Sequence, residues 1–122
     1  MSVFDASALL AVAYAETGSD VASRRLATGV ISTVNVAEAA GRMVQKGARA
    51  EAAVAELRNL GLRWIAPGAD LIARVAELRA IKDLSLGDRF CIALAEQRGE
   101  PIVTADQDWR DLPIRVPLEL IR

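Results

Sequence analysis

The chain has 122 residues, of which 52% are hydrophobic and only 4% aromatic, so we expect one domain, residues 1–122, with a core of aliphatic side chains. Its 15 basic and 16 acidic residues give a net charge of −1, which excludes an overall positive field that attracts nucleic acid. The absence of histidine excludes histidine-based nucleophile systems and histidine-bearing zinc sites. Carboxylate chemistry, with a hard metal ion, remains.

The single cysteine, Cys91, excludes an intrachain disulfide and suits a reducing compartment. The first residues lack the basic flank and long apolar stretch of a signal peptide, and no apolar run reaches membrane-spanning length. We therefore expect a cytoplasmic protein that does not cross a membrane.

Strand-like and helix-like segments alternate along the chain. Short apolar runs predict strands at residues 3–4, 30–31, 62–65, 102–104 and 114–116. Apolar residues at helical spacing predict helices at 7–15, 19–28, 33–46, 50–60, 71–78 and 87–98. Ser7 is the expected N-cap of the first helix, and Gly29 is expected just past the end of the second. Strands separated by helices predict an α/β fold in which helices cover both faces of a parallel sheet.

Two aspartates lie at the ends of predicted strands. Asp5 comes after the first strand and Asp106 after the strand at 102–104. Ligands of parallel sheets bind beyond the carboxyl ends of the strands, so both side chains are expected at one edge, with Ser7 and Thr104 beside them. For Asp106 the residues alone also allow an ordinary turn, because Asp106-Gln107-Asp108 has turn chemistry.

Asp88 lies in the first turn of the predicted helix at 87–98, on the same face as apolar neighbours such as Cys91 and Ile92. A carboxylate on a buried face needs a partner. Two interpretations stay open, a site residue and a first-turn aspartate stabilised by the helix dipole or by Arg89.

Glu38 is the least distinctive acid, because Asn35 and Arg42 lie three and four residues away on its helix. A surface pair with Arg42 is sufficient to explain Glu38 alone. Several carboxylates at one sheet edge repel each other unless a divalent cation neutralises them, and ligands that are all oxygen favour Mg²⁺ or Mn²⁺. Such ions activate water for attack on a phosphodiester.

Four segments carry a resemblance to a known family. They are residues 3–7, 33–38, 84–95 and 103–109, with Ser-Leu-Gly-Asp-Arg heading the apolar helix and Thr-x-Asp before Trp109. In this order they resemble a PIN-domain protein and, more narrowly, a VapC-type toxin of a bacterial type II toxin-antitoxin system. The likeness extends over nearly the whole chain.

The resemblance implies a three-layer α/β/α sandwich around a parallel sheet of four or five strands, and metal-dependent endoribonuclease activity. Asp5, Glu38, Asp88 and Asp106 match the acidic quartet of the family. Asp5, Asp88 and Asp106 are the implied ligands of Mg²⁺ or Mn²⁺. Ser7 and Thr104 match polar residues that line the metal, and Asp108 lies close to a further acidic position. The implied partners are an RNA substrate, a second copy of the chain in a homodimer, and a small VapB-like antitoxin that donates a basic side chain into the site.

We therefore predict an endoribonuclease toxin in which Glu38 positions the water or a second ion. Arg24, Arg25 and Arg42 are candidates for contact with RNA phosphates, although each also fits an ordinary surface charge. Two alternatives are a non-catalytic partner-binding module and a receiver-like phosphoacceptor domain. A receiver-like domain is expected to have a lysine at the end of a late strand, and the strands at 102–104 and 114–116 have none.

Overall fold

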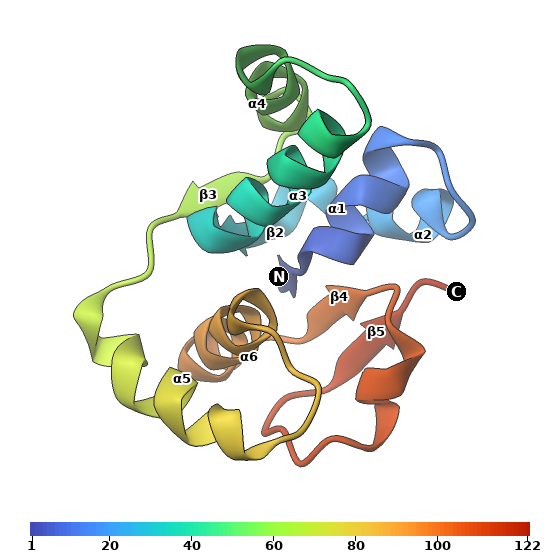
Figure 1. Ribbon diagram of the computed structural model, residues 1–122. Coiled ribbons are helices and arrows are strands. Elements are labelled where there is room, and N and C mark those ends of the chain that lie inside the picture. Colours follow the sequence, from blue (N-terminus) through green and yellow to red (C-terminus); the bar gives the residue numbers. More distant parts are fainter.

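The computed structural model describes all 122 residues and contains five parallel strands (Figure 1). The strands are β1 (Ser2–Phe4), β2 (Gly29–Ser32), β3 (Arg63–Ile65), β4 (Ile102–Thr104) and β5 (Leu118–Leu120). Their order in the sheet is β3-β2-β1-β4-β5, and each neighbouring pair is parallel. This confirms the predicted α/β architecture with the larger of the two expected strand numbers.

Helices cover both faces of the sheet. The α-helices are α1 (Ala6–Ala13), α2 (Ser19–Ser23), α3 (Thr33–Gln45), α4 (Ala50–Arg58), α5 (Ile72–Glu77) and α6 (Leu86–Arg98). Short 3₁₀ turns occur at Leu26–Thr28 (η1), Ala69–Leu71 (η2), Leu78–Ala80 (η3) and Gln107–Asp111 (η4). In Figure 1, α1 to α4 lie above the sheet, and α5 and α6 lie below it. None of the helices is long and apolar enough to span a membrane.

The inner strands β1, β2 and β4 are buried on both faces because each face is covered by helices. Val3, which points to the α5–α6 side, belongs to one hydrophobic cluster, and Phe4 belongs to the cluster of the α1–α4 side. The same alternation holds for Val30 and Ile31 in β2. The period of two along each strand thus divides the aliphatic core into two halves.

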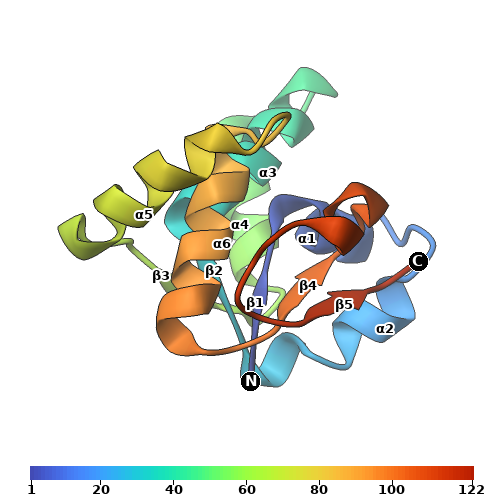
Figure 2. The same cartoon turned by 90° about the horizontal axis from the view of Figure 1, so that it is seen from below.

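The strand order reverses beside β1. The chain runs from β1 outward through β2 to β3, and then returns to place β4 on the other side of β1. Figure 2 shows β1 rising from the N-terminus into α1, between β2 on one side and β4 on the other. At such a reversal the connections diverge to opposite faces, which opens a crevice beyond the carboxyl ends of the strands. Asp5 follows β1 and Ala105-Asp106 follows β4, so both segments meet at this crevice.

Two local predictions were wrong. The last strand is Leu118–Leu120, because these residues pair with Ile102–Thr104, whereas the backbone N–H of Arg115 donates to Glu96. The prediction for Gly29 is confirmed, because Gly29 lies just past the 3₁₀ turn η1, and it is also the first residue of β2. A Cβ there would lie 2.6 to 2.9 Å from atoms of neighbouring residues, so Gly29 is explained by close packing. The second wrong prediction, the cap of α1, concerns the site and is described there.

Candidate active site

Asp5 is the N-cap of α1 and lies at the floor of the crevice, with 4% of its surface exposed. Its Oδ1 accepts a hydrogen bond from the backbone N–H of Ala8 at 2.9 Å. This corrects the prediction for Ser7, whose hydroxyl instead contacts the Asp5 carboxylate at 2.7 and 2.9 Å. The hydroxyl of Thr104 donates to Asp5 Oδ2 at 2.6 Å. All partners of Asp5 are therefore neutral donors.

The two hydroxyls are fixed in their donor role by the backbone. Ser7 Oγ accepts from the N–H of Ala105 at 2.9 Å, and Thr104 Oγ1 accepts from the N–H of Asp106 at 3.0 Å. Their protons are thus left to point at Asp5. The loop after β4 is thereby tied to the start of α1, so residues 98 and 99 positions apart in the sequence form the floor of the cleft together.

Burial raises the pKa of Asp5 to about 6, against hydrogen bonds from Thr104, Ala8 and Ser7 that favour the charged form, and the nearby charge of Asp88 raises it further. None of the five ion pairs of the protein includes Asp5. The buried carboxylate therefore carries a charge that no cation of the chain neutralises.

Asp88 and Asp106 lie at the starts of other helical turns. Asp88 forms a capping box with Ser85 at the start of α6: its Oδ2 accepts from the N–H of Ser85 at 3.0 Å, and its N–H donates to Ser85 Oγ at 3.1 Å. Asp106 caps η4 by accepting from the N–H of Asp108 at 2.9 Å. Both carboxylates are half-buried. Each keeps one oxygen, Asp88 Oδ1 and Asp106 Oδ2, without a hydrogen bond inside the protein.

Glu38 lies on α3 and faces the first turn of α6. Its Oε1 accepts from Asn35 Nδ2 at 2.9 Å, and the same amide group donates to the carbonyl of Gly87 at 3.0 Å. No ion pair joins Glu38 to Arg42, so the surface pair that the spacing suggests does not form. Burial raises the pKa of Glu38, and the charge of Asp88 raises it further.

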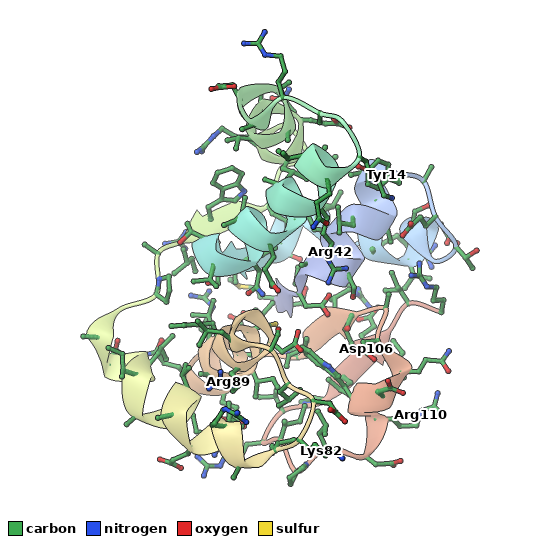
Figure 3. The ribbon with its side chains drawn as sticks, viewed as in Figure 1. Tyr14, Arg42, Lys82, Arg89, Asp106 and Arg110 are labelled. Carbon is green, nitrogen blue, oxygen red and sulfur yellow. The ribbon has the colours of Figure 1, made fainter.

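These residues line one open cleft of about 360 Å³ at the carboxyl edge of the sheet. Its lining is Asp5, Ala6, Ser7, Glu38, Arg42, Ser85, Asp88, Ala105, Asp106 and Arg122. In Figure 3 the side chains of Arg42 and Asp106 lie toward the middle of this edge, Arg42 coming from α3 and Asp106 from the end of β4. The cleft is thus a four-carboxylate pocket with two arginines in its wall.

A comparison with protein families finds that the PIN domain model matches residues 2–114. The chain belongs to the PIN domain family. No curated protein matches it significantly. Among solved structures, the VapC20 toxin of Mycobacterium tuberculosis, described as cleaving the sarcin-ricin loop, is similar at 21% identity with a TM-score of 0.73; the match covers 94% of this chain and 97% of that one.

VapBC2 from Rickettsia felis, solved with a promoter DNA fragment, is similar at 18% identity and a TM-score of 0.76, covering 98% of this chain and 97% of that one. A toxin-antitoxin complex from Klebsiella pneumoniae is similar at 17% identity and a TM-score of 0.72, covering 100% and 98%. At these identities the likeness establishes the PIN fold that the sequence resemblance implies.

Not every residue singled out in the sequence lines the cleft of this PIN domain. Thr104 is fully buried behind Asp5, and Asp108 is exposed in a smaller neighbouring pocket that shares Asp106. Arg25 pairs with Glu119 at 3.0 Å beside residues that precede the strands, so it lies at the opposite edge of the sheet. Arg24, next to it in the chain, does not line the cleft either. Of the three arginines predicted to meet phosphate, only Arg42 lies at the site.

Three site residues were missed. Ser85 stands three residues before Asp88, the spacing of a capping box, so its role was visible in the sequence. Asn35 stands three residues before Glu38 on one helix, which marks it as a neighbour but not as a buried one. Arg122 carries no local signal, because it reaches the cleft only through the pairing of β5 with β4.

The donor set of the cleft consists of carboxylate and hydroxyl oxygens, which suits Mg²⁺ or Mn²⁺. As the side chains stand, no three of the acids are close enough to hold one ion. Asp88, Asp106 and Glu38 are each turned into a local hydrogen bond, and each has a further oxygen free to take another partner. The chemistry of the cleft fits a hard divalent cation, and binding one requires these side chains to converge.

Proposed function

We propose that this PIN domain is a cytoplasmic, metal-dependent endoribonuclease and the toxin of a type II toxin-antitoxin pair. The observation that carries the proposal is the buried Asp5, which has only neutral donors for partners at the floor of a four-carboxylate cleft. Uncompensated carboxylates raise each other's proton affinity, so the cleft favours a divalent cation. Family membership supports nuclease chemistry at this site.

Asp5, Asp88 and Asp106 are the residues that hold the metal in this proposal. Bound Mg²⁺ or Mn²⁺ supplies an activated water and neutralises charge on the phosphodiester. Ser7 and Thr104 hold the Asp5 carboxylate in place through their hydroxyls. Glu38, on the α3 side of the cleft, orients the attacking water.

Arg42 and Arg122 line the same cleft. Arg42 forms no ion pair, whereas Arg122 Nη1 donates to the carbonyl of Thr17 at 2.9 Å and lies 3.6 Å from Glu16 Oε1. A guanidinium presents a planar fork of donors that matches phosphate oxygens. We assign both to the RNA backbone on either side of the cleaved bond. Because the whole chain carries a charge of −1, RNA binding depends on this local pair.

The partners follow the resemblance to VapC-type toxins. Tyr14, Val44 and Val54 are exposed apolar residues at or near α1, α3 and α4. Exposed apolar side chains on neighbouring helices suit contact with another chain. We propose that the protein forms a homodimer and that a VapB-like antitoxin segment covers the cleft and places a basic side chain against the acids.

The receiver-like alternative has no support at the site, because no lysine lines the cleft and both lysines, Lys46 and Lys82, are exposed. A non-catalytic module of the same fold has no need for four acids around an unpaired buried aspartate. A direct assay in which the purified protein does not cleave RNA would favour this second alternative.

The test is RNA cleavage by rigorously purified protein in three arms. We expect cleavage with millimolar Mg²⁺ or Mn²⁺, none in chelator with recovery on adding excess metal, and none when the partner encoded beside the gene is bound. Undiminished cleavage in chelator contradicts the metal role. Cleavage by the partner-bound protein contradicts the toxin-antitoxin assignment and leaves the nuclease intact.

A further inference from the structure

We propose that Asn35 and Gly87 are positioning residues that place the Glu38 carboxylate against the first turn of α6, beside Asp88. The proposal rests on the proposed nuclease function and adds two residues to it. Neither residue has a charge or a nucleophile, and neither is among the acids of the family resemblance. Asn35 donates a hydrogen bond to Glu38, and a Cβ atom at Gly87 would collide with the Glu38 carboxyl group.

Asn35 connects two helices through one amide group. It lies in the first turn of α3 with 1% of its surface exposed. Its Nδ2 donates one hydrogen bond to Glu38 Oε1 at 2.9 Å and another to the Gly87 carbonyl at 3.0 Å, across 52 residues of sequence. Both amide protons are therefore used to fix the Glu38 carboxylate relative to α6.

The oxygen of the Asn35 amide group indicates that this residue serves as a hydrogen-bond donor. Its Oδ1 is buried and has no hydrogen-bond partner. Turning the amide over would set this oxygen against two acceptors, Glu38 Oε1 and the Gly87 carbonyl, so the donor orientation is the only favourable one. A buried polar atom without a partner costs stability. Asn35 thus bears a cost in the fold and provides two donors at the cleft.

Gly87 provides the space that Glu38 occupies. A Cβ built at Gly87 would lie 2.6 Å from Glu38 Oε2 and closer still to Oε1, and its three nearest atoms all belong to the Glu38 carboxyl group. No backbone atom is among these neighbours. Glycine lowers helix stability, so its place inside α6 needs a packing reason. An alanine here would therefore push the Glu38 carboxylate away from its present position.

Together the two residues define one position for Glu38. Asn35 holds Oε1 from the α3 side, and the bare Cα of Gly87 lets the carboxylate reach the start of α6, where Asp88 is close enough to raise the pKa of Glu38. Oε2 has no hydrogen bond within the protein, and Glu38 itself lines the cleft. Asn35 and Gly87 therefore determine that Glu38 Oε2 is the oxygen available to the water of the proposed reaction.

The decisive variant is Gly87→Ala, with Gly41→Ala as its matched control. Gly41 is an exposed helical glycine whose added Cβ meets nothing within 4 Å. We expect Gly87→Ala to lower kcat for RNA cleavage about 10- to 100-fold, as for a displaced proton-transfer or water-positioning group, with KM changed less than about threefold. The melting temperature should stay level or rise for both variants because alanine favours the helix, and Gly41→Ala should cleave like the parent.

The Gly87→Ala substitution in a second variant, Glu38→Asp, shows whether its effect on kcat depends on the Glu38 side chain. In a Glu38→Asp background the carboxylate is one methylene shorter, so the new methyl group should reduce the remaining rate at most about twofold. A crystal structure of Gly87→Ala should show the Glu38 carboxylate displaced from Asn35. Asn35→Asp, which keeps the shape and repels Glu38, should lower kcat in the same direction.

The outcomes separate the two proposals. If the parent protein fails to cleave RNA with any divalent metal, the proposed function is wrong. If the parent cleaves and Gly87→Ala retains full kcat, or loses equally much in both backgrounds, or leaves Glu38 unmoved in the crystal, then Asn35 and Gly87 do not position Glu38.

Discussion

Asp5 and Glu96 are two carboxylates with little exposure that the fold treats in opposite ways. Glu96, whose side chain is 6% exposed, accepts from Arg74 Nε at 2.6 Å and Nη2 at 3.0 Å, and from the N–H of Arg115 at 3.0 Å. Those partners lower the pKa of Glu96 although burial opposes them. Asp5 has hydroxyl and amide donors and no cation, and its pKa is raised.

The difference in partners distinguishes a carboxylate that stabilises the fold from one whose charge has no cationic partner in the chain. Glu96 ties α5 and the segment before β5 to α6, and its charge is neutralised inside the chain. Asp5 lies where the strand order reverses, in a cleft with three other acids. Removing the charge of each residue should therefore have opposite consequences for activity and for stability.

The largest expected effect is on cleavage. Asp5→Asn keeps the shape of the side chain and removes a proposed metal ligand, so we expect cleavage to fall by about 10³-fold or more. Glu96→Gln is the matched control, because it also turns a carboxylate with little exposure into an amide, and it should retain cleavage within about threefold. The measurement is the initial rate on one RNA substrate at saturating Mg²⁺. Equal losses in the two variants would remove the distinction.

The next effect is the response of stability to pH in chelator. Asp5 has a folded pKa of about 6 against an ordinary value of 3.8, so the folded state binds more protons and its stability falls as the pH rises through this window. The full contribution is on the order of 3 kcal/mol. Glu96 has a lowered folded pKa, so its contribution is present above its ordinary value of 4.5 and is lost as the pH falls below it.

Denaturant unfolding of the parent, Asp5→Asn and Glu96→Gln between pH 4 and pH 7 checks both signs. Asp5→Asn should flatten the decline between pH 4 and pH 6, and Glu96→Gln should make it steeper, because it removes the compensating gain. Parallel pH curves for the parent and Asp5→Asn would mean that Asp5 does not titrate in this window.

The smallest effects are on stability at neutral pH. In chelator, Glu96→Gln should lose about 2 kcal/mol, because Arg74 loses its charged partner. Asp5→Asn should stay within about 1 kcal/mol of the parent, because the loss of an uncompensated buried charge offsets the mismatch between the new NH₂ group and the donors around it. Millimolar Mg²⁺ should raise the melting temperature of the parent and of Glu96→Gln, and that of Asp5→Asn much less. An Asp5→Asn protein that is less stable in chelator by more than about 1 kcal/mol, yet responds to Mg²⁺ like the parent, would make Asp5 a structural residue.

Most of the fold could be predicted because local signals coincide with tertiary ones. Apolar pairs such as Val3-Phe4 mark buried strands, and the apolar stripe of α6 marks its packing on the sheet. The last strand could not be placed from the sequence, because residues 114–116 and 118–120 are equally apolar. Only the pairing of Leu118–Leu120 with β4 identifies the second segment as the strand. Propensity alone does not distinguish two neighbouring candidates when the choice depends on a contact with β4.

The candidate site was predictable in its acids and less so in what surrounds them. Asp5 and Asp106 follow strands, which is a sequence signal, and their meeting follows from parallel pairing. The cap of α1 was misplaced because Asp5 and Ser7 are both good caps, and only the bond from the Ala8 N–H distinguishes them. The Asn35 bridge depends on how α3 packs against α6, which no spacing within α3 encodes.

The position of β1 has a consequence for the order in which the protein is made. β1 is the central strand and the first to be synthesised, yet one of its two neighbours is β4, and Thr104 meets Asp5 across 99 residues of sequence. Contacts of such long range form late and slow folding. On the ribosome, β1, β2 and β3 can assemble with α1 to α4 first. At that stage Thr104 and Asp106 have not been translated, so Asp5 has no contact with them. The cleft is therefore completed late, because it cannot form before the segment that contains Thr104 and Asp106 has been translated.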